Sequence, residues 1–364
     1  MIFNYLSKST LLLLCLLFMC LSSCKVLHSD KEKGLKDYYK NYFPIGVAIN
    51  ANTLKDVKEV NLIRKEFNSI TTENEMKMSS IAPKKDVYNW KNADALVNFA
   101  GENKMKVRGH TLLWHKQTPD WMFLDDKGKQ VTREVLLNRL RDYIFTVMTR
   151  YKGKVYAWDV VNEAIDDDKS NFYRKSKWLD IIGEDYIEKA FEYAHEADPK
   201  ALLFYNDYNT EYAAKRDKIY QLIKKLKEKN IPINGLGLQA HWSIFELSET
   251  QLRKSIELFS SLGIQLHFTE LDVSIYKWEP DERKKRADEN DKLTPELEEK
   301  QAEKYAMFFK VFREYQKNIT SVTFWNLSDR YSWLDDFPIA GRKNYPTIFD
   351  ANLIPKKSYY KIKP

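Results

Sequence analysis

The sequence predicts an α/β protein folded as a single (β/α)8 TIM barrel, and three observations favour this architecture. Short apolar runs rich in β-branched and aromatic residues recur along the chain, as expected of strands buried on both faces of a parallel sheet. Stretches with the helical spacing of apolar residues lie between these runs. The chain has 364 residues and no linker-like break in composition after its first segment, so one large domain accounts for it. A doubly wound sheet is the alternative, because periodicity does not show whether a sheet closes.

The first 24 residues are typical of a bacterial lipoprotein signal peptide. Lys8 precedes an apolar run over residues 11–21, which is too short to span a bilayer. The run ends in Leu21-Ser22-Ser23-Cys24, which resembles the lipobox whose cysteine is lipidated and becomes the first mature residue. We therefore expect an exported protein in the periplasm or on the cell surface, attached to a membrane through a lipid on Cys24.

The segment after this signal indicates a short tether followed by one domain. Residues 25–37 are polar and mixed in charge, as a tether would be, and the predicted domain covers residues 38–364. All three cysteines lie at or before Cys24, so the domain has no disulfide, no cysteine metal ligand and no catalytic thiol. The net charge of +7 is interspersed rather than gathered in a basic stripe. We expect no nucleic-acid partner, and a monomer.

Eight apolar runs bounded by turn residues are predicted to be the strands. They cover residues 45–49, 67–72, 105–114, 155–161, 201–205, 235–240, 264–273 and 319–327. Helical stripes lie within residues 186–194, 219–226 and 305–312. Two helix starts are also marked, by a capping box from Ser248 to Gln251 and by Thr294 before Pro295. The charged stretch after the seventh run is predicted to be a solvated loop.

Two of the predicted strands run directly into a glutamate. One passes through Trp158 and Asn162 to Glu163, and the other reaches Glu270. Catalytic groups of a parallel barrel lie at the carboxyl ends of its strands, and a carboxylate closing an apolar strand is costly without a partner. Two such residues therefore indicate a catalytic pair. Glycoside hydrolysis needs such a pair, with one carboxyl group protonated and the other ionised.

The neighbouring residues suggest how the two roles divide. Asp272 and His241 are candidates to hold Glu270 ionised, because an imidazole between two carboxylates can donate to both. Glu163 has no cationic partner in the sequence and follows Trp158 closely. We therefore expect Glu163 to be the proton donor.

Six segments in order carry a resemblance to a known family. They are residues 67–77, 108–115, 158–164, 235–241 and 269–272, followed by Trp325 with Tyr331-Ser332-Trp333-Leu334. Together they resemble glycoside hydrolase family 10, the retaining endo-β-1,4-xylanases. The resemblance covers nearly the whole mature chain and favours the closed barrel. It implies xylan and xylo-oligosaccharides as substrates, a covalent glycosyl-enzyme intermediate, and no cofactor or catalytic metal.

The resemblance also implies a role for each matching residue. Glu163 matches the general acid/base, and Glu270 matches the nucleophile. His241 and Asp272 match the histidine bonded to the nucleophile and the aspartate that orients it. The other matches contact substrate: Asn162 and Gln239 at the 2-hydroxyl of the sugar at the cleavage point, Lys77 and His110 around that sugar, Glu73 and Asn74 at the next sugar toward the non-reducing end, and Trp114, Trp325 and Trp333 as aromatic walls.

Within this family, the residue matching Trp333 crowds the space that the hydroxymethyl group of glucose would need, which favours xylan over cellulose. Two positions depart from the family's pattern: Met78-Ser79 stands where Trp-Asp is usual, and Asn326 stands where Gly is usual. Both bear on subsite affinity and preferred chain length. The alternatives are a related barrel hydrolase acting on another β-glycan, such as mixed-linkage glucan, and a non-catalytic glycan-binding lipoprotein on a decayed barrel.

Other conspicuous residues have structural interpretations. His110, His115 and His241 lack the spacing of zinc ligands, so no metal site is predicted. His267 lies inside a predicted strand and is interpreted as a core histidine. The acidic run at residues 166–168 is interpreted as a solvated turn.

Overall fold

The computed structural model describes residues 33–364. The predicted signal peptide, the lipidated Cys24 and most of the tether lie outside the described residues. A compact unit begins at Gly34, and helix α2 (Leu35–Tyr38) follows at once with Leu35 fully buried. Within the described part of the chain, no helix is both long enough and apolar enough to cross a bilayer.

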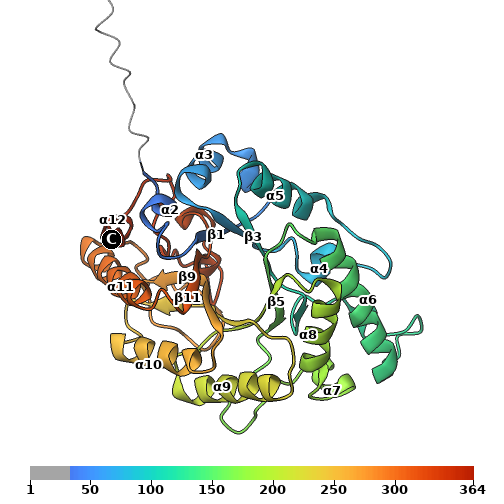
Figure 1. The fold of residues 1–364 in the computed structure, drawn as a ribbon. Helices are drawn as coiled ribbons and strands as arrows, with labels where there is room; N and C mark the ends of the chain where they lie inside the picture. Colours follow the sequence, from blue (N-terminus) through green and yellow to red (C-terminus); the bar gives the residue numbers. More distant parts are fainter. Residues whose placement is uncertain (1–32) are drawn as a thin grey trace, which may run out of the picture. The chain divides into compact units, whose positions relative to one another are not determined.

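Eight parallel strands close into a barrel with helices around it (Figure 1). The sheet is closed because its last strand, β11, pairs in parallel with both β1 and β9. The (β/α)8 prediction is therefore confirmed, and the doubly wound alternative is wrong, because an open sheet would leave two strand edges unpaired. Each predicted run overlaps one barrel strand. In order around the barrel they are β1 (Ile45–Ile49), β2 (Ser69–Thr72), β3 (Lys106–Gly109), β5 (Ala157–Asn162), β6 (Leu202–Asp207), β7 (Gly235–Leu238), β9 (Gln265–Ser274) and β11 (Ile319–Phe324).

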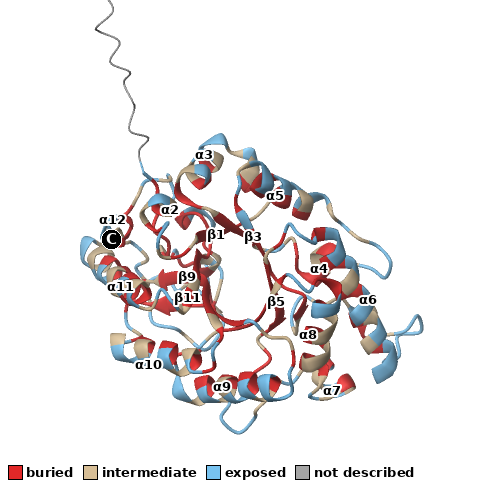
Figure 2. Cartoon of the chain, viewed as in Figure 1, coloured by how far each residue is buried: buried red, intermediate tan, exposed pale blue. Residues whose placement is uncertain are grey.

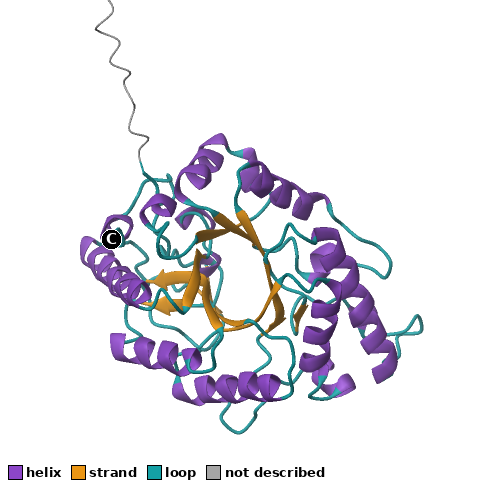
Figure 3. Cartoon of the chain, viewed as in Figure 1, coloured by secondary structure: helices purple, strands orange, loops and turns teal. Residues whose placement is uncertain are grey.

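The helices form an outer layer around the strands (Figure 3) and turn their buried side toward them (Figure 2). The predicted stripes fall in α8, α9 and α11, and their apolar residues are buried. Both predicted helix starts are present, because Ser248 forms the capping box with Gln251 and Thr294 caps the helix that Pro295 begins. The bounds are α3 (Val57–Glu66), α4 (Met78–Ile81), α5 (Lys91–Glu102), α6 (Arg133–Tyr151), α7 (Lys177–Ile182), α8 (Tyr186–Ala197), α9 (Ala213–Glu228), α10 (Glu249–Ser260), α11 (Pro295–Glu314) and α12 (Lys357–Lys361).

Two of the predicted strands are interrupted and are followed by a second short strand, and each break lies beside candidate site residues. The run at 105–114 divides into β3 and the short β4 (Leu113–Trp114), which pairs with β5. The run at 235–240 stops at Leu238, and β8 (His241–Ser243) follows, paired with the far end of β9. Ala240, between these two strands, has a φ of 65°, a left-handed conformation that interrupts a strand.

The charged stretch after β9 is a loop, but its charges are paired rather than only solvated. Arg283 forms ion pairs with Glu279 at 2.7 Å and Glu289 at 2.5 Å, and Arg342 reaches Glu279 at 2.5 Å. Within the loop, β10 (Arg283–Lys284) pairs with β12 (Ile339–Ala340). These contacts fasten the loop to the segment that follows Trp333.

Candidate active site

The candidate residues gather at the carboxyl ends of the barrel strands, where a parallel barrel brings the ends of distant strands to one rim. Asn162 ends β5 and Glu163 follows it, while Gln239 follows β7 and His241 begins β8. Glu270 and Asp272 lie in the outer half of the long strand β9. Three further residues stand directly after a strand, namely Glu73 after β2, His110 after β3 and Trp325 after β11.

Glu270 is buried among groups that favour its ionised form. The Nε2 atom of His241 lies 3.2 Å from Glu270 Oε2, and its Nδ1 lies 2.9 Å from Asp272 Oδ2. Burial acts to raise the pKa of Glu270, but the hydrogen bond from His241, the charges of His110 and His241, and the hydrogen bond from Asn206 lower it to about 2. Burial likewise acts to lower the pKa of His241, yet Asp272 and Glu270 raise it to about 10. An imidazolium therefore lies between two carboxylates and donates to both.

The carboxylate of Glu163 is surrounded by neutral hydrogen-bond donors. Trp114 donates from Nε1 to Oε2 at 2.9 Å, and Gln239 donates from Nε2 to Oε1 at 3.1 Å. Asn162 Nδ2 lies 3.3 Å from the same Oε1. Among residues 33–364, no arginine, lysine or histidine forms an ion pair with this carboxylate. The partners of Glu163 therefore supply hydrogen bonds but no formal positive charge, unlike those of Glu270.

The sequence suggested the wrong tryptophan as the neighbour of Glu163. Trp158 is fully buried and packs toward Tyr151. A Cβ added to Gly109 on the adjacent strand would lie 2.2 Å from the Trp158 ring. The Trp158 ring therefore lies on the side of β5 that faces α6. The indole beside Glu163 is that of Trp114, which comes from β4.

A chain of side-chain amides joins the two glutamates. Gln239 Nε2 donates to both Glu163 Oε1 at 3.1 Å and Asn162 Oδ1 at 3.2 Å. Asn206 Nδ2 donates to Asn162 Oδ1 at 2.9 Å and to Glu270 Oε1 at 2.7 Å. The two carboxylates therefore face the same opening of the barrel.

Asn206 was not among the predicted site residues. Thr269 fixes the orientation of its amide by donating to Asn206 Oδ1 at 2.7 Å. The signal that could have found it is its position in the penultimate place of β6, one residue beyond the predicted run at 201–205. Polar residues at that end of a strand were the same signal that identified the two glutamates.

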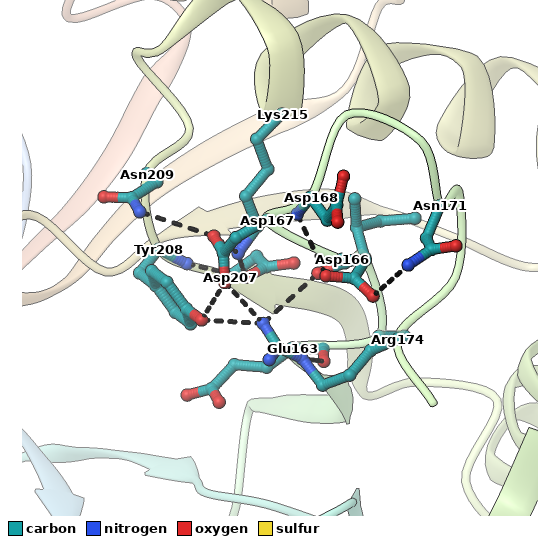
Figure 4. A network of polar contacts seen from close by, with 12 residues as sticks. Glu163, Asp166, Asp167, Asp168, Asn171, Arg174, Asp207, Tyr208, Asn209 and Lys215 are labelled. Atoms are coloured by element: carbon teal, nitrogen blue, oxygen red, sulfur yellow. Dashed lines mark hydrogen bonds and ion pairs between the residues drawn. The ribbon is translucent and has the colours of Figure 1, made fainter. Parts of the chain in front are cut away.

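The backbone of Glu163 is held in a left-handed conformation, with a φ of 57°. Its N–H donates to Asn206 O at 2.9 Å, and its carbonyl oxygen accepts from Arg174 Nε at 3.0 Å. Arg174 also forms an ion pair with Asp167 at 2.9 Å and donates to the Tyr208 hydroxyl at 2.6 Å (Figure 4). Arg174 is thus a direct link between the backbone of Glu163 and a charged network.

This network involves the acidic run that was interpreted as a solvated turn. Lys215 is buried and bridges Asp167 at 3.0 Å and Asp207 at 2.9 Å. Burial acts to raise the pKa of Asp167, but Lys215, Tyr208 and Arg174 lower it to about 2. Asp168 is also exposed and bonds to the nearby Ser170. The solvated-turn interpretation therefore fits Asp168, whereas Asp167, although exposed, also takes part in the charged network.

Lys77 occupies an aromatic and acidic corner of the site. Its Nζ lies 5.2 Å from the centre of the Trp114 ring and 5.9 Å from that of Trp325, and it donates to Asn74 Oδ1 at 2.9 Å. Burial lowers the pKa of Lys77, opposed by the carboxylates of Glu270, Glu73 and Glu163. A cavity of about 470 Å³ extends from Glu73 to Trp333, which suits further sugar residues.

Trp333 lies over the His241 half of the site. Its Nε1 donates to Asp272 Oδ2 at 2.8 Å, and its ring centre is 4.9 Å from that of His241. His110 Nδ1 lies 2.9 Å from Asp159 Oδ2, and Arg108 also binds this buried carboxylate. Trp333 Nε1 and His110 Nδ1 are therefore held by carboxylates inside the protein.

The structure also shows the surroundings of the other residues that the sequence singled out. Among the described residues, no group of three or more histidines, cysteines and carboxylates is arranged to hold a metal ion. His267 lies in the core, 4.1 Å from the Phe204 ring centre. Met78 is buried in the core. Asn326 has a φ of 76°, a conformation that suits the usual glycine.

Comparisons with known proteins agree on one family. The sequence model of "Glycosyl hydrolase family 10" matches residues 34–364. Endo-1,4-beta-xylanase B of Paenibacillus barcinonensis is 48% identical over 334 residues, which are 92% of this chain and 98% of that protein. Endo-1,4-beta-xylanase A of Caldicellulosiruptor saccharolyticus is 46% identical over 344 residues, with 94% and 98% covered.

Solved structures are similar over the same extent. The crystal structure of xylanase XynB from Paenibacillus barcinonensis, complexed with a conduramine derivative, has a TM-score of 0.87 at 47% identity, covering 91% of this chain and 98% of the other. A mutant structure in complex with xylotriose has a TM-score of 0.86 at 44% identity, covering 90% and 98%.

Proposed function

Because this chain belongs to glycosyl hydrolase family 10, a retaining family, and is an endo-1,4-β-xylanase, we propose that Glu163 and Glu270 are its two catalytic carboxylates. The observation that supports this most is the chain of amides through Gln239, Asn162 and Asn206, which brings both groups to one opening. The two carboxylates differ in the way that the two-step reaction requires, since one is held ionised and the other has neutral partners.

In the first step, the ionised Glu270 oxygen attacks the anomeric carbon of the sugar at the cleavage point. The bond from this carbon to the glycosidic oxygen breaks, and Glu163 gives its proton to that oxygen as the leaving chain departs. His241 and Asp272 keep Glu270 ionised before the attack. Asn162 and Gln239 are proposed to bind the 2-hydroxyl, where hydrogen bonds strengthen in the transition state.

In the second step, Glu163, now ionised, takes a proton from water while the water oxygen attacks the same carbon. The bond to Glu270 breaks, and both carboxyl groups return to their starting states. Two inversions leave the product in the β configuration. Lys77, His110, Glu73 and Asn74 are proposed to hold the sugars on the non-reducing side, between the walls of Trp114, Trp325 and Trp333.

A mechanism-based label tests the assignment of the nucleophile. An activated 2-deoxy-2-fluoro-xylobioside forms the glycosyl-enzyme but slows its hydrolysis, because the fluorine destabilises the charged transition state. Peptide mass spectrometry should find the sugar on Glu270, and label on any other residue would contradict the proposal. Xylo-oligosaccharide added as a competitor should slow the labelling, which confirms that it takes place in the cleft.

We also propose that the enzyme is exported and anchored to a membrane by a lipid on Cys24. The lipobox after a signal-type apolar run supports this, although Cys24 lies outside the described residues. In the native host, xylanase activity should be found in the membrane fraction, and Cys24→Ala should move it to the soluble fraction. Membrane association that survives this substitution would contradict a lipid on Cys24.

A further inference from the structure

The amino-terminal face of the barrel, opposite the catalytic rim, carries a set of exposed lysines. The segments that run from the end of a helix, or from α2, into the next barrel strand all lie on this face. Only one acidic residue occurs in them among the described residues, Asp198, and it is buried. We name the exposed lysines of these segments the basic face: Lys40, Lys104, Lys152, Lys154, Lys200, Lys229 and Lys317.

Most of the basic face has no internal partner for its charge. Within the described part of the chain, no carboxylate forms an ion pair with Lys40, Lys104, Lys154, Lys200 or Lys317. Lys229 pairs with Glu188 at 2.6 Å, and Lys152 donates to Ala197 O at 2.9 Å. A cation near the carboxyl end of a helix is favourable, but that effect does not require lysine in nearly every connection.

Nearby acidic residues neutralise this face only in part. Of the exposed glutamates in the last turns of the helices, Glu196 pairs with Arg141, Glu228 with Lys224 and Glu314 with Arg253, whereas Glu102 and Glu257 form no ion pair within the described part of the chain. Glu66 is buried. The loops at the catalytic rim differ, because they mix both signs, as in the acidic run with Asp167 and the paired charges around Arg283.

We propose that the basic face docks on an anionic lipid bilayer. Anionic lipid surfaces attract clustered lysines, and the attraction acts within a Debye length of the surface. The first residues of the folded unit lie on this same face, because Leu35 N donates to Glu66 Oε2 at 2.8 Å just before β2. A lipid on Cys24, proposed above, would bring this side of the barrel to the membrane.

Docking through the basic face gives the enzyme a fixed orientation. The catalytic rim is at the other ends of the same strands, so the cleft points away from the membrane toward polymer outside the cell. Neither the catalytic assignment nor the lipid anchor is needed for the docking itself, which rests on the charges of the folded unit. The docking can therefore fail without affecting the proposed function.

Vesicle binding by the folded unit tests the proposal. Residues 34–364 can be used alone, because a solved relative whose chain is 98% covered spans no more than this unit and folds as the same barrel. At low salt it should sediment with vesicles of phosphatidylglycerol and phosphatidylcholine but not with phosphatidylcholine alone. Binding should weaken strongly at about 0.5 M salt. Equal binding to both kinds of vesicle, or binding to neither, would overturn the proposal.

Matched variants locate the surface that binds. One replaces Lys40, Lys104, Lys154, Lys200 and Lys317 with Gln. One lysine near an anionic surface strengthens partitioning onto the membrane about fivefold. The vesicle partition coefficient of this variant should therefore fall by at least tenfold. The control replaces exposed lysines in loops of the opposite rim with Gln, namely Lys84, Lys85, Lys127, Lys129 and Lys169, and should bind almost as the parent does.

Both variants should keep the parent's activity on a soluble xylo-oligosaccharide, which shows that they are folded. If the basic-face variant and the control variant lost the same amount of vesicle binding, the binding would depend only on net charge, and the proposal would be overturned. If the basic-face variant lost retention on glucuronate-bearing xylan but not on vesicles, the face would instead bind an anionic polysaccharide. A fluorophore on Lys317→Cys should respond to vesicles, whereas one on Lys127→Cys should not, and the reverse result would also overturn the docking.

Discussion

The two halves of the site differ in the kind of partner that surrounds each glutamate. Glu270 is buried next to an imidazolium, with the charge of Asp272 behind it. Glu163 is less buried, and its carboxylate meets an indole and two amides. The first arrangement keeps one protonation state throughout the resting enzyme. The second supplies hydrogen bonds without a formal positive charge, so the proposed division of roles follows from the partners rather than from the glutamates themselves.

Replacing the ionised member should have the largest effect. Glu270→Gln removes the attacking oxygen but keeps the shape of the side chain, so xylan turnover should fall by at least about 10⁴-fold. Binding of xylan should remain nearly unchanged, as measured by affinity electrophoresis. Substantial turnover in this variant would contradict the assignment of Glu270 as the nucleophile.

Replacing Glu163 should have an effect on the rate that depends on the leaving group of the substrate. In Glu163→Ala, turnover of xylan should fall by about 10²- to 10⁴-fold, because the departing sugar needs a proton. Formation of the glycosyl-enzyme from an aryl xylobioside with an acidic phenol should be much less affected, as pre-steady-state release of the phenol would show. Equal losses on both substrates would argue that Glu163 is not the acid.

Trp333 tests whether the Glu270 half also selects the sugar. Trp333→Ala opens the space beside the site, so the preference for xylan over cellulose, as a ratio of kcat/KM values, should fall about tenfold. Tyr360→Ala is the control, since this aromatic residue is 59% exposed on α12. An unchanged ratio in Trp333→Ala would assign the selection to another residue.

Arg174 tests whether the Glu163 half depends on its backbone support. Arg174→Gln removes the charge that links the Glu163 carbonyl to Asp167, so kcat on xylan should fall by about 3- to 10-fold with KM nearly constant. The loss should be smaller with a good leaving group. Arg133→Gln, at an exposed ion pair with Asp185, is the control. Equal losses on both substrates would indicate a general disturbance of the fold.

The smallest effect concerns the stability of the Glu270 half. The pKa of His241 is about 10 in the folded protein against an ordinary 6.5, so its contribution is complete below pH 6.5 and disappears as the pH rises toward 10. The pKa of Glu270 is about 2 against an ordinary 4.5, so its contribution is complete above pH 4.5 and disappears toward pH 2. Both are therefore complete between pH 4.5 and 6.5.

Denaturant unfolding can measure this window. The free energy of unfolding should decline more steeply between pH 7 and pH 9.5 in the parent than in His241→Asn, where the titrating group is gone. Parallel curves would show that His241 is not held as the cation in the folded protein.

The sequence predicted the barrel and most of the site because their signals are local. Apolar runs alternate with helical stripes; Glu163 stands where one apolar run ends, and Glu270 interrupts another, the run at 264–273. The match to a family then connected segments that are distant in the chain. Residues such as Lys77 and Gln239 became candidates only through that match, since a lone lysine or glutamine has no local signature.

What the sequence did not predict depends on contacts between distant segments. The break between β3 and β4 places the Trp114 indole beside Glu163. Trp158, which is close to Glu163 in the sequence, is instead buried in the core. Asn206 lies one residue beyond a predicted strand, and its role depends on the registers of its neighbours. Arg174 reaches Glu163 across a loop, and no periodic pattern encodes such a contact.

The ion pairs of Arg283 and Arg342 with Glu279 join the loop after β9 to the segment that follows Trp333. The two glutamates stand on the rim of the barrel itself, whereas Trp333 stands on this outer segment and reaches back to Asp272 through its Nε1. Insertions, deletions or grafts that move Trp333 should therefore change both the space beside the sugar site and the support of Asp272. For protein engineering, the two segments joined by these ion pairs are a suitable first target for a library of variants.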